Sequence, residues 1–224
     1  MNQIHQFELG ASNLFLITGG RPVLVDTGTG GGPDEFRSIC RSCGLEPSDI
    51  ELIVISHEHA DHFVNLEWMQ KMTGGAPVVC HKAAGRFLEE GLAPQVVARN
   101  EIGEEAIKSP PALGRIPKVR PDITFEGKFD LRAYGIDGEI VSTPGHSEGS
   151  TAIILDSREA IVGDTVLRRH GGEEVVVSFL ATDTVALRNS VALLLSRVDT
   201  FYCGHGGPYG RDEVKAALER DHSW

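Results

Sequence analysis

The most constraining feature of this sequence is a run of metal-binding residue types that directly follows an apolar segment. Residues 52–55 (Leu-Ile-Val-Ile) are typical of a buried strand, and the chain from His57 to His62 reads His-Glu-His-Ala-Asp-His. Residues two apart in an extended chain point to the same side, so His57 and His59 can face one metal ion. Asp61 and His62 follow after a turn and can approach from another direction. Because four adjacent ligands would crowd one tetrahedral ion, the spacing favours two neighbouring ions.

Three more candidate ligands lie in similar local settings. His146, Asp164 and His205 each come after a short apolar segment and directly after a glycine. Glycine lets the backbone approach a site closely and adopt turns that other residues avoid. Taken alone, each of these residues is more often an ordinary loop or cap residue than a ligand. Their shared setting, together with the run at 57–62, favours one metal centre.

The order of the expected elements predicts two layers of strands between helices. In the first half, strands are expected at 4–9, 14–18, 22–26, 52–55 and 77–80, with helices at 34–44, 65–73 and 83–90. In the second half, strands are expected near 123–126, 140–142, 151–155, 160–162 and 200–203, with helices at 183–195 and 212–220. Two halves of strands followed by helices predict an α/β fold with two sheets face to face and helices outside. The helix at 183–195 carries a broad apolar face, made of Val185, Leu187, Val191, Leu194 and Leu195.

The chain of 224 residues is expected to form a single domain with a sizeable core, over residues 1–224. Residues 91–121 contain five prolines and little clean periodicity. A long irregular segment in a compact domain is often functional, so a lid or pocket insertion is one interpretation of 91–121. A surface excursion without a role is the other.

With these motifs in place, the chain resembles the metallo-β-lactamase-fold superfamily, and within it the hydrolase branch that includes glyoxalase II and the lactonases. The similarity covers nearly the whole chain. Val25-Asp26-Thr27-Gly28 resembles the first motif of the family, the run at 57–62 the second, and His146, Asp164 and His205 the third, fourth and fifth. The resemblance implies an αββα sandwich of two mixed β-sheets packed face to face. It is specific for the superfamily and much less so for the substrate.

The family pattern also assigns roles to these residues. It implies that His57, His59 and His146 hold one metal ion, that Asp61, His62 and His205 hold the other, and that Asp164 bridges both. Asp26 would accept a hydrogen bond from a ligand histidine and orient its ring. Asp61 would also help to move a proton to the leaving group.

Metal chemistry then predicts the reaction. Imidazole and carboxylate ligands suit two divalent ions, zinc above all, with iron or manganese as alternatives. A hydroxide bridging the two ions would attack an ester-type carbonyl, in a thioester or a lactone, and no protein nucleophile would be needed. Arg168 or Arg169 could contact a substrate carboxylate or phosphate, although each alone is more often a solvated charge, and His170 is expected at the surface.

Two other functions stay open. A persulfide dioxygenase of the same superfamily would hold one iron through His57, His146 and Asp164. A non-catalytic metal-binding sensor would keep the site without the reaction. A glutathione thioester is disfavoured as substrate because only 19 residues follow His205, where glyoxalase II has a further helical region. The large additions of RNA-processing relatives have no counterpart here.

Composition limits the partners. The formal net charge of −11 argues against a nucleic-acid partner, and it disfavours a strongly anionic substrate. No apolar run approaches the roughly 20 residues of a membrane span, and the N-terminus lacks the pattern of a signal peptide. We therefore expect a cytoplasmic protein that acts on a small-molecule substrate, with no membrane partner. An acidic surface is compatible with any oligomeric state.

Cys40 and Cys43 are expected to be two partly buried thiols on a helix. Cys40 and Cys43 form a Cys-x-x-Cys pair, but they fall within an expected helix and the sequence has no second pair to complete a zinc site. Cys203 is expected to pack at the end of its strand. In one subclass of the superfamily's β-lactamases a cysteine is a metal ligand at the fourth motif. This chain has Asp164 at that position, which argues against a β-lactamase of that subclass.

Overall fold

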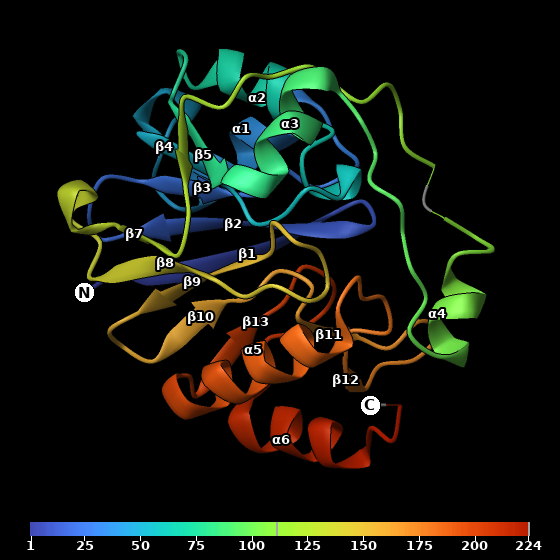
Figure 1. Ribbon diagram of the computed structural model, residues 1–224. Coiled ribbons are helices and arrows are strands. Elements are labelled where there is room, and N and C mark those ends of the chain that lie inside the picture. Colours follow the sequence, from blue (N-terminus) through green and yellow to red (C-terminus); the bar gives the residue numbers. More distant parts are fainter. Residues whose placement is uncertain (111, 224) are drawn as a thin grey trace.

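The computed structural model describes residues 1–110 and 112–223, and its main strands form two six-stranded sheets (Figure 1). The first sheet has the order β1-β2-β3-β4-β5-β6. Its strands are β1 (Gln3–Leu9), β2 (Ser12–Thr18), β3 (Val23–Val25), β4 (Leu52–Ile55), β5 (Val78–His81) and β6 (Ile123–Phe125). The first three strands pair antiparallel, and β3 to β6 pair parallel. The sheet is therefore mixed, as predicted.

The second sheet has the order β14-β13-β10-β9-β8-β7. Its strands are β7 (Lys128–Asp130), β8 (Gly138–Ser142), β9 (Thr151–Leu155), β10 (Glu159–Ile161), β13 (Thr200–Tyr202) and β14 (Tyr209–Gly210). Only β10 and β13 pair parallel in this sheet, while its other pairs are antiparallel. A separate hairpin consists of β11 (Val166–Arg168) and β12 (Val175–Val177).

Helices cover the outer face of each sheet (Figure 1). The helices α1 (Pro33–Ser42), α2 (Leu66–Met72) and α3 (Lys82–Glu90) lie on the side of the first sheet, and α5 (Thr184–Arg197) and α6 (Arg211–Arg220) on the side of the second. Short 3-10 turns occur at Pro47–Asp49, Ala60–His62 and Arg132–Tyr134. None of the helices in the described ranges is long and apolar enough to cross a membrane. The predicted αββα sandwich is confirmed.

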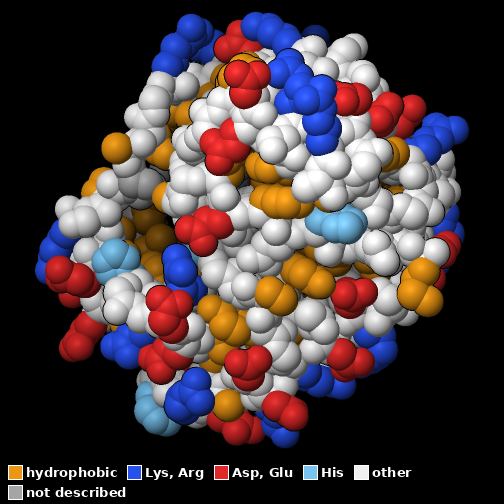
Figure 2. Space-filling view, turned by 180° about the vertical axis from the view of Figure 1, so that it is seen from behind, with side chains coloured by type: hydrophobic (Ala, Val, Ile, Leu, Met, Phe, Trp, Pro, Cys, Tyr) orange, Lys and Arg blue, Asp and Glu red, His pale blue; other side chains and the backbone are white. Residues whose placement is uncertain are grey.

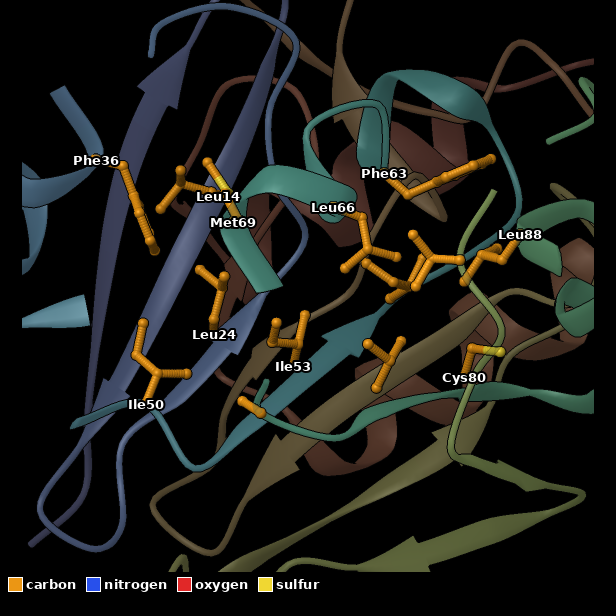
Figure 3. Close-up of a cluster of buried hydrophobic side chains, with 14 of the residues drawn as sticks. Leu14, Leu24, Phe36, Ile50, Ile53, Phe63, Leu66, Met69, Cys80 and Leu88 are labelled. Atoms are coloured by element: carbon orange, nitrogen blue, oxygen red, sulfur yellow. The ribbon is translucent and has the colours of Figure 1, made fainter. Parts of the chain in front are cut away.

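Strand β4 shows why these residues form a central strand. All four of its side chains are fully buried. Leu52 and Val54 belong to the cluster between the two sheets, whereas Ile53 and Ile55 belong to the cluster under the helices. Figure 3 shows the second of these clusters, with Ile53 among side chains of α1 and α2. A strand buried on both faces reads as a continuous apolar run because successive side chains point to opposite sides.

The predicted apolar face of α5 is correct for its centre and wrong at its start. Leu187, Val191 and Leu194 are fully buried in the cluster beneath the second sheet, and Leu195 packs against that cluster, whereas Val185 is 69% exposed. Val185 lies two residues before Leu187, which is about 200° around a helix of 3.6 residues per turn. It therefore points away from the sheet.

The structure also contains elements that the sequence patterns did not predict. These are the hairpin β11–β12, the short strands β7 and β14, and the helix α4 (Glu101–Ala106), which lies inside the segment expected to be irregular. The helix α4 begins at Asn100, whose side chain accepts a hydrogen bond from the Gly103 amide (3.1 Å). Helices and strands of two to six residues carry too little periodicity to be recognised from sequence.

Candidate metal centre

The predicted ligands follow the ends of strands from both sheets. The loop 56–62 leaves the C-terminal end of β4, and His146 follows β8 in the second sheet. Asp164 and His205 follow β10 and β13, which are parallel neighbours. The ends of parallel strands lie at the same edge of a sheet, so the pairing of β10 with β13 brings Asp164 close to His205.

Three histidines lie side by side in the first of two ligand clusters, which we call the three-histidine cluster. His146 Nε2 is 2.7 Å from His59 Nδ1 and 3.3 Å from His57 Nε2, and His57 Nε2 is 3.2 Å from His59 Nδ1. All three side chains are buried. Their ring nitrogens are close enough together to hold one metal ion.

Two histidines and a carboxylate form the second cluster, which we call the acid–histidine cluster. Asp61 Oδ2 lies 3.6 Å from His62 Nε2 and 3.3 Å from His205 Nε2. These three groups could also hold a metal ion. The side chains of Asp61 and His205 are 16% and 21% exposed, so this cluster lies nearer to solvent than the first.

Asp164 lies between the two clusters. Its Oδ2 atom is 3.3 Å from His205 Nε2 and 3.8 Å from His146 Nε2, while its Oδ1 atom is 3.5 Å from His62 Nε2. One carboxylate therefore reaches ligand atoms of both clusters. The structure thus brings all seven predicted ligands together, and their binding of metal stays a prediction.

Two buried atoms at this junction test whether a metal would fit. Within residues 1–110 and 112–223, neither His62 Nε2 nor Asp164 Oδ1 has a hydrogen-bond partner. The two atoms lie 3.5 Å from each other, so they attract as charges but form no hydrogen bond of ordinary length. Both atoms are of types that bind divalent metal ions, and a metal ion near them would satisfy both. The donor set and its unpartnered atoms therefore fit a metal.

The glycine before His205 allows the close approach that this junction requires. A Cβ atom at Gly204 would lie 2.2 Å from Asp164 Oδ1 and 2.6 Å from His62 Cε1. Any side chain there would therefore displace the two groups whose free atoms face each other. The predicted reason for a glycine at this position is confirmed.

Asp26 orients the acid–histidine cluster from outside. Its Oδ2 atom lies 2.9 Å from His62 Nδ1 and accepts a hydrogen bond from Ser56 Oγ (2.6 Å), while its Oδ1 atom accepts from the Ser56 amide (2.7 Å). Asp26 is fully buried and has a φ of 56°, a conformation that side chains other than glycine seldom adopt. The predicted contact between Asp26 and a ligand histidine is present. The backbone strain at Asp26 persists because these hydrogen bonds hold the carboxylate in place.

Two other ligand histidines, His146 and His205, have outer partners that the sequence did not reveal. His146 Nδ1 is 2.9 Å from Ser178 Oγ and 3.1 Å from the Leu180 carbonyl oxygen, and His205 Nδ1 is 2.6 Å from the Ala11 carbonyl oxygen. A carbonyl oxygen only accepts, so these contacts place a proton on Nδ1 and leave Nε2 to bind a metal. Backbone carbonyls far away in the chain leave no signal in a sequence.

A buried glutamate ties the two histidine loops together. Glu58 Oε2 accepts a hydrogen bond from Ser147 Oγ (2.8 Å), and Glu58 Oε1 accepts one from the Gly149 amide (3.2 Å). Glu58 therefore joins the loop of His57 and His59 to the loop of His146. This residue of the 57–62 run, which was not a predicted ligand, supports the geometry of the first cluster.

Burial governs protonation in the three-histidine cluster. Desolvation, together with the neighbouring imidazole of His59, lowers the pKa of His146 to about 4. Burial likewise lowers the pKa of His57 and that of His59. These imidazoles are therefore neutral at pH 7, which is the form that binds metals.

Carboxylates govern protonation in the acid–histidine cluster. Burial opposes the charged form of His205, but Asp164 and Asp61 together raise its pKa to about 10. His62 is buried too, and Asp61, Asp164 and Asp26 hold its pKa well above the usual value. Burial works against ionisation of Asp164, but His205 and His62 hold its pKa well below the usual range. Without a metal, this cluster contains carboxylates paired with imidazolium ions.

The arginines predicted to contact substrate lie on and beside the hairpin β11–β12. The backbone amide of Arg168 donates to the His205 carbonyl oxygen (2.9 Å), and its guanidinium is 3.8 Å from Glu173. Arg169 donates to Glu174 (2.6 Å) and lines a cavity of about 650 Å³ that contains none of the predicted ligands. His170 is exposed, as predicted. A substrate contact by either arginine stays a prediction.

Cys203 is buried at the end of its strand, as predicted, whereas Cys40 is fully buried and not partly buried as expected. In the described chain all four are free, and Cys40, Cys80 and Cys203 are buried while Cys43 is half-buried at the end of α1. Burial raises the pKa of Cys40 to about 12, so this thiol is not reactive at neutral pH.

Comparison with known proteins agrees with this geometry. The family model for the metallo-β-lactamase superfamily matches residues 8–205. A probable metallo-hydrolase of Methanocaldococcus jannaschii is 29% identical over 201 residues, which cover 88% of this chain and 88% of that protein. The atrochrysone carboxyl ACP thioesterase of Aspergillus fumigatus is 30% identical over 205 residues, covering 90% of this chain but 39% of that enzyme. A metallo-β-lactamase superfamily protein from Sulfolobus tokodaii has a similar crystal structure, with a TM-score of 0.70 at 18% sequence identity. The similarity covers 98% of this chain and 86% of that protein.

Proposed function

Because this chain belongs to the metallo-β-lactamase superfamily, we propose that it is a hydrolase that holds two divalent metal ions and cleaves an ester-type bond, a thioester or a lactone, in a small molecule. The observation that carries this proposal is the position of Asp164 between two ligand clusters. Its two carboxylate oxygens lie within 3.8 Å of His146, His62 and His205. A single ion would be bound by only some of these clustered side chains and would leave the others without a metal to bind.

The residues divide the work between them. His57, His59 and His146 would hold one ion, Asp61, His62 and His205 the other, and Asp164 both. Bound there, such ions supply an activated water and polarise the carbonyl of the substrate. Asp26, Ser178 and the carbonyls of Leu180 and Ala11 fix the rings of the ligand histidines.

Substrate would approach from the side of Asp61 and His205, since these are the more exposed ligands. Asp61 is the more accessible of the two carboxylates, because its side chain is 16% exposed and that of Asp164 is 7% exposed. Asp61 is therefore the group placed to pass a proton to a leaving group that departs towards solvent. Deprotonated at neutral pH, it would accept this proton from the attacking water.

Two observations support a neutral ester-type substrate. The net charge of −11 disfavours strongly anionic molecules. The similarity to a fungal thioesterase, although this chain spans only 39% of that enzyme, shows that a protein with a related sequence carries out thioester hydrolysis. Zinc is the expected metal because imidazole and carboxylate ligands suit it, and iron or manganese would use the same donors.

Elemental analysis of the purified protein tests this proposal first. About two zinc, iron or manganese ions per chain, together with hydrolysis of chromogenic thioesters or lactones, would support it. One iron per chain, with oxygen consumption in the presence of a persulfide, would replace it with a dioxygenase that uses His57, His146 and Asp164. Bound metal without turnover of any tested substrate would favour a sensor.

A further inference from the structure

Exposed apolar side chains are concentrated in one segment of the described chain. Apart from Met1, six large hydrophobic residues are exposed, and four of them lie within residues 92–107. They are Leu92, Val96, Val97 and Ile107, with exposures of 38–44%. Single exposed apolar residues are ordinary on a protein surface, whereas a contiguous apolar patch marks a site of interaction or ligand binding. We call residues 91–110 and 112–121 the apolar strap.

The apolar strap is fixed to the body of the protein next to these residues. The Arg99 amide donates to the Phe179 carbonyl oxygen (2.9 Å), the Ala181 amide donates to the Val97 carbonyl oxygen (3.0 Å), and Ala98 and Leu180 form an antiparallel bridge. Val96 and Val97 are therefore held in place by backbone hydrogen bonds.

A buried ion pair strengthens this attachment. The Arg99 side chain is 1% exposed, forms an ion pair with Asp221 and donates from Nε to the Ser178 carbonyl oxygen (2.8 Å). Ser223 Oγ also accepts a hydrogen bond from Arg99 (2.8 Å). Through Arg99, the strap is bonded both to residues 178–181 and to the segment after α6.

The residues that anchor the strap also hold a ligand histidine. Ser178 Oγ and the Leu180 carbonyl oxygen contact His146 Nδ1. Residues 178–181 therefore have the strap on one side and the three-histidine cluster on the other. Paired strands lie about 4.8 Å apart, so Val96 and Val97 lie within the length of a short hydrocarbon chain of the metal centre.

The surface is hollowed beside the strap. Figure 1 shows the segment between α3 and β6 running along one side of both layers, past α4. Figure 2, which views the molecule from behind, shows a hollow between this outer segment and the body, with apolar side chains inside it. A hydrocarbon chain lying in this hollow would contact apolar surface.

We propose that the apolar strap binds the hydrocarbon chain of the substrate, so that this protein acts on esters or thioesters of extended, uncharged acyl groups. This inference rests on the proposed function, since it places the carbonyl of the substrate at the metal centre and its acyl chain along Val96, Val97 and Ile107. Each methylene buried on such a wall strengthens binding by up to about fourfold.

Binding of straight-chain carboxamides tests the inference separately from hydrolysis. Hexanamide, octanamide and decanamide keep the carbonyl and are uncharged, and calorimetry gives their dissociation constants with the metal-loaded full chain. We expect the dissociation constant to fall by about two- to fourfold per methylene, or about 16- to 256-fold over the four methylenes from hexanamide to decanamide. A constant that does not fall with chain length would overturn the inference.

Matched variants test whether the hydrocarbon chain contacts the apolar strap. Val96→Ser combined with Val97→Ser should weaken decanamide binding by about fivefold, with a smaller loss for hexanamide, because less chain reaches the strap. Leu193→Ser is the control, since Leu193 is equally exposed (41%) but lies on α5, and it should change neither constant. Equal binding of decanamide by the valine variant and the natural protein would place the chain elsewhere and contradict the proposal.

Hydrolysis of p-nitrophenyl esters of the same chain lengths separates the two proposals. If binding strengthens with chain length but no ester is hydrolysed, the proposed role of the apolar strap stands and the proposed hydrolase activity is wrong. If the esters are hydrolysed at a rate that does not depend on chain length, the hydrolase activity stands and the proposed role of the apolar strap is wrong.

Discussion

The two ligand clusters share one loop and one carboxylate, yet they differ in burial and in charge. The three-histidine cluster is at most 8% exposed, and burial keeps its imidazoles neutral. The acid–histidine cluster is nearer to solvent, and its carboxylates hold protons on His62 and His205. The three-histidine cluster is therefore already in the protonation state that binds metal, whereas the acid–histidine cluster must release protons before it can bind.

The outer partners differ in the same sense. His146 is oriented by a serine hydroxyl and a backbone carbonyl, both neutral, while His62 is oriented by the buried carboxylate of Asp26. A carboxylate partner raises the basicity of an imidazole and strengthens its bond to a metal. Neutral partners fix ring orientation with a smaller effect on basicity.

The largest effect is expected from removing the group that joins the clusters. Asp164→Ala should lower metal content towards one ion per chain or less, and reduce hydrolysis by more than the roughly 100-fold that the loss of an outer partner costs. Mass spectrometry of bound metals and ester hydrolysis check this together. Full activity in this variant would sink the scheme with two metal ions.

A smaller, one-sided effect is expected at Asp26. Asp26→Asn keeps the side-chain shape and tolerates the positive φ, but it removes the charge and replaces one of the two accepting oxygens by an NH2 group. Affinity for the ion at the acid–histidine cluster should fall by about 10- to 100-fold. Competition with a chelator measures each ion, and a loss shared equally by both ions would show that Asp26 does not act on one cluster.

Proton release should separate the clusters by pH. With a pKa of about 10, His205 is protonated at pH 7 and must lose its proton to bind metal. Affinity at the acid–histidine cluster should therefore rise by about tenfold per released proton for each unit between pH 7 and pH 9. His146, with a pKa of about 4, is already neutral, so affinity at the three-histidine cluster should stay level over that range. Chelator competition at pH 7, 8 and 9 gives both slopes, and equal slopes would remove the distinction.

The smallest effect is expected at Ser178. Ser178→Ala removes the hydroxyl beside His146 Nδ1, but the Leu180 carbonyl oxygen remains 3.1 Å away. Affinity at the three-histidine cluster should fall by less than about 10-fold, the lower end of the cost for an outer partner. Chelator competition again measures it, with Ser157→Ala on the exposed surface as the control. A loss as large as that of Asp26→Asn would mean that the two kinds of outer partner do not differ.

Much of the ligand geometry was contained in short stretches of sequence. The run at 57–62, and the glycines before Asp164 and His205, carry their information locally, because a strand end and the next few residues are placed together whatever the rest of the chain does. The family pattern then supplied the grouping of ligands. The layers of the fold could be predicted for the same reason, since β4 and the centre of α5 show their burial in the spacing of apolar residues.

The partners of these ligands were decided only by the tertiary structure. The carbonyl oxygen of Ala11 contacts His205, which is 194 residues away in the sequence, and that of Leu180 contacts His146, which is 34 residues away. Every residue type has such a backbone carbonyl. The exposure of Val185 and the attachment of the apolar strap to residues 178–181 likewise depend on what packs nearby. The candidate ligands and the strands that precede them could be recognised from local sequence alone. Long-range packing decided which cluster is dry and neutral and which is open and charged, because burial and neighbouring charge belong to the folded chain and to no single segment of it.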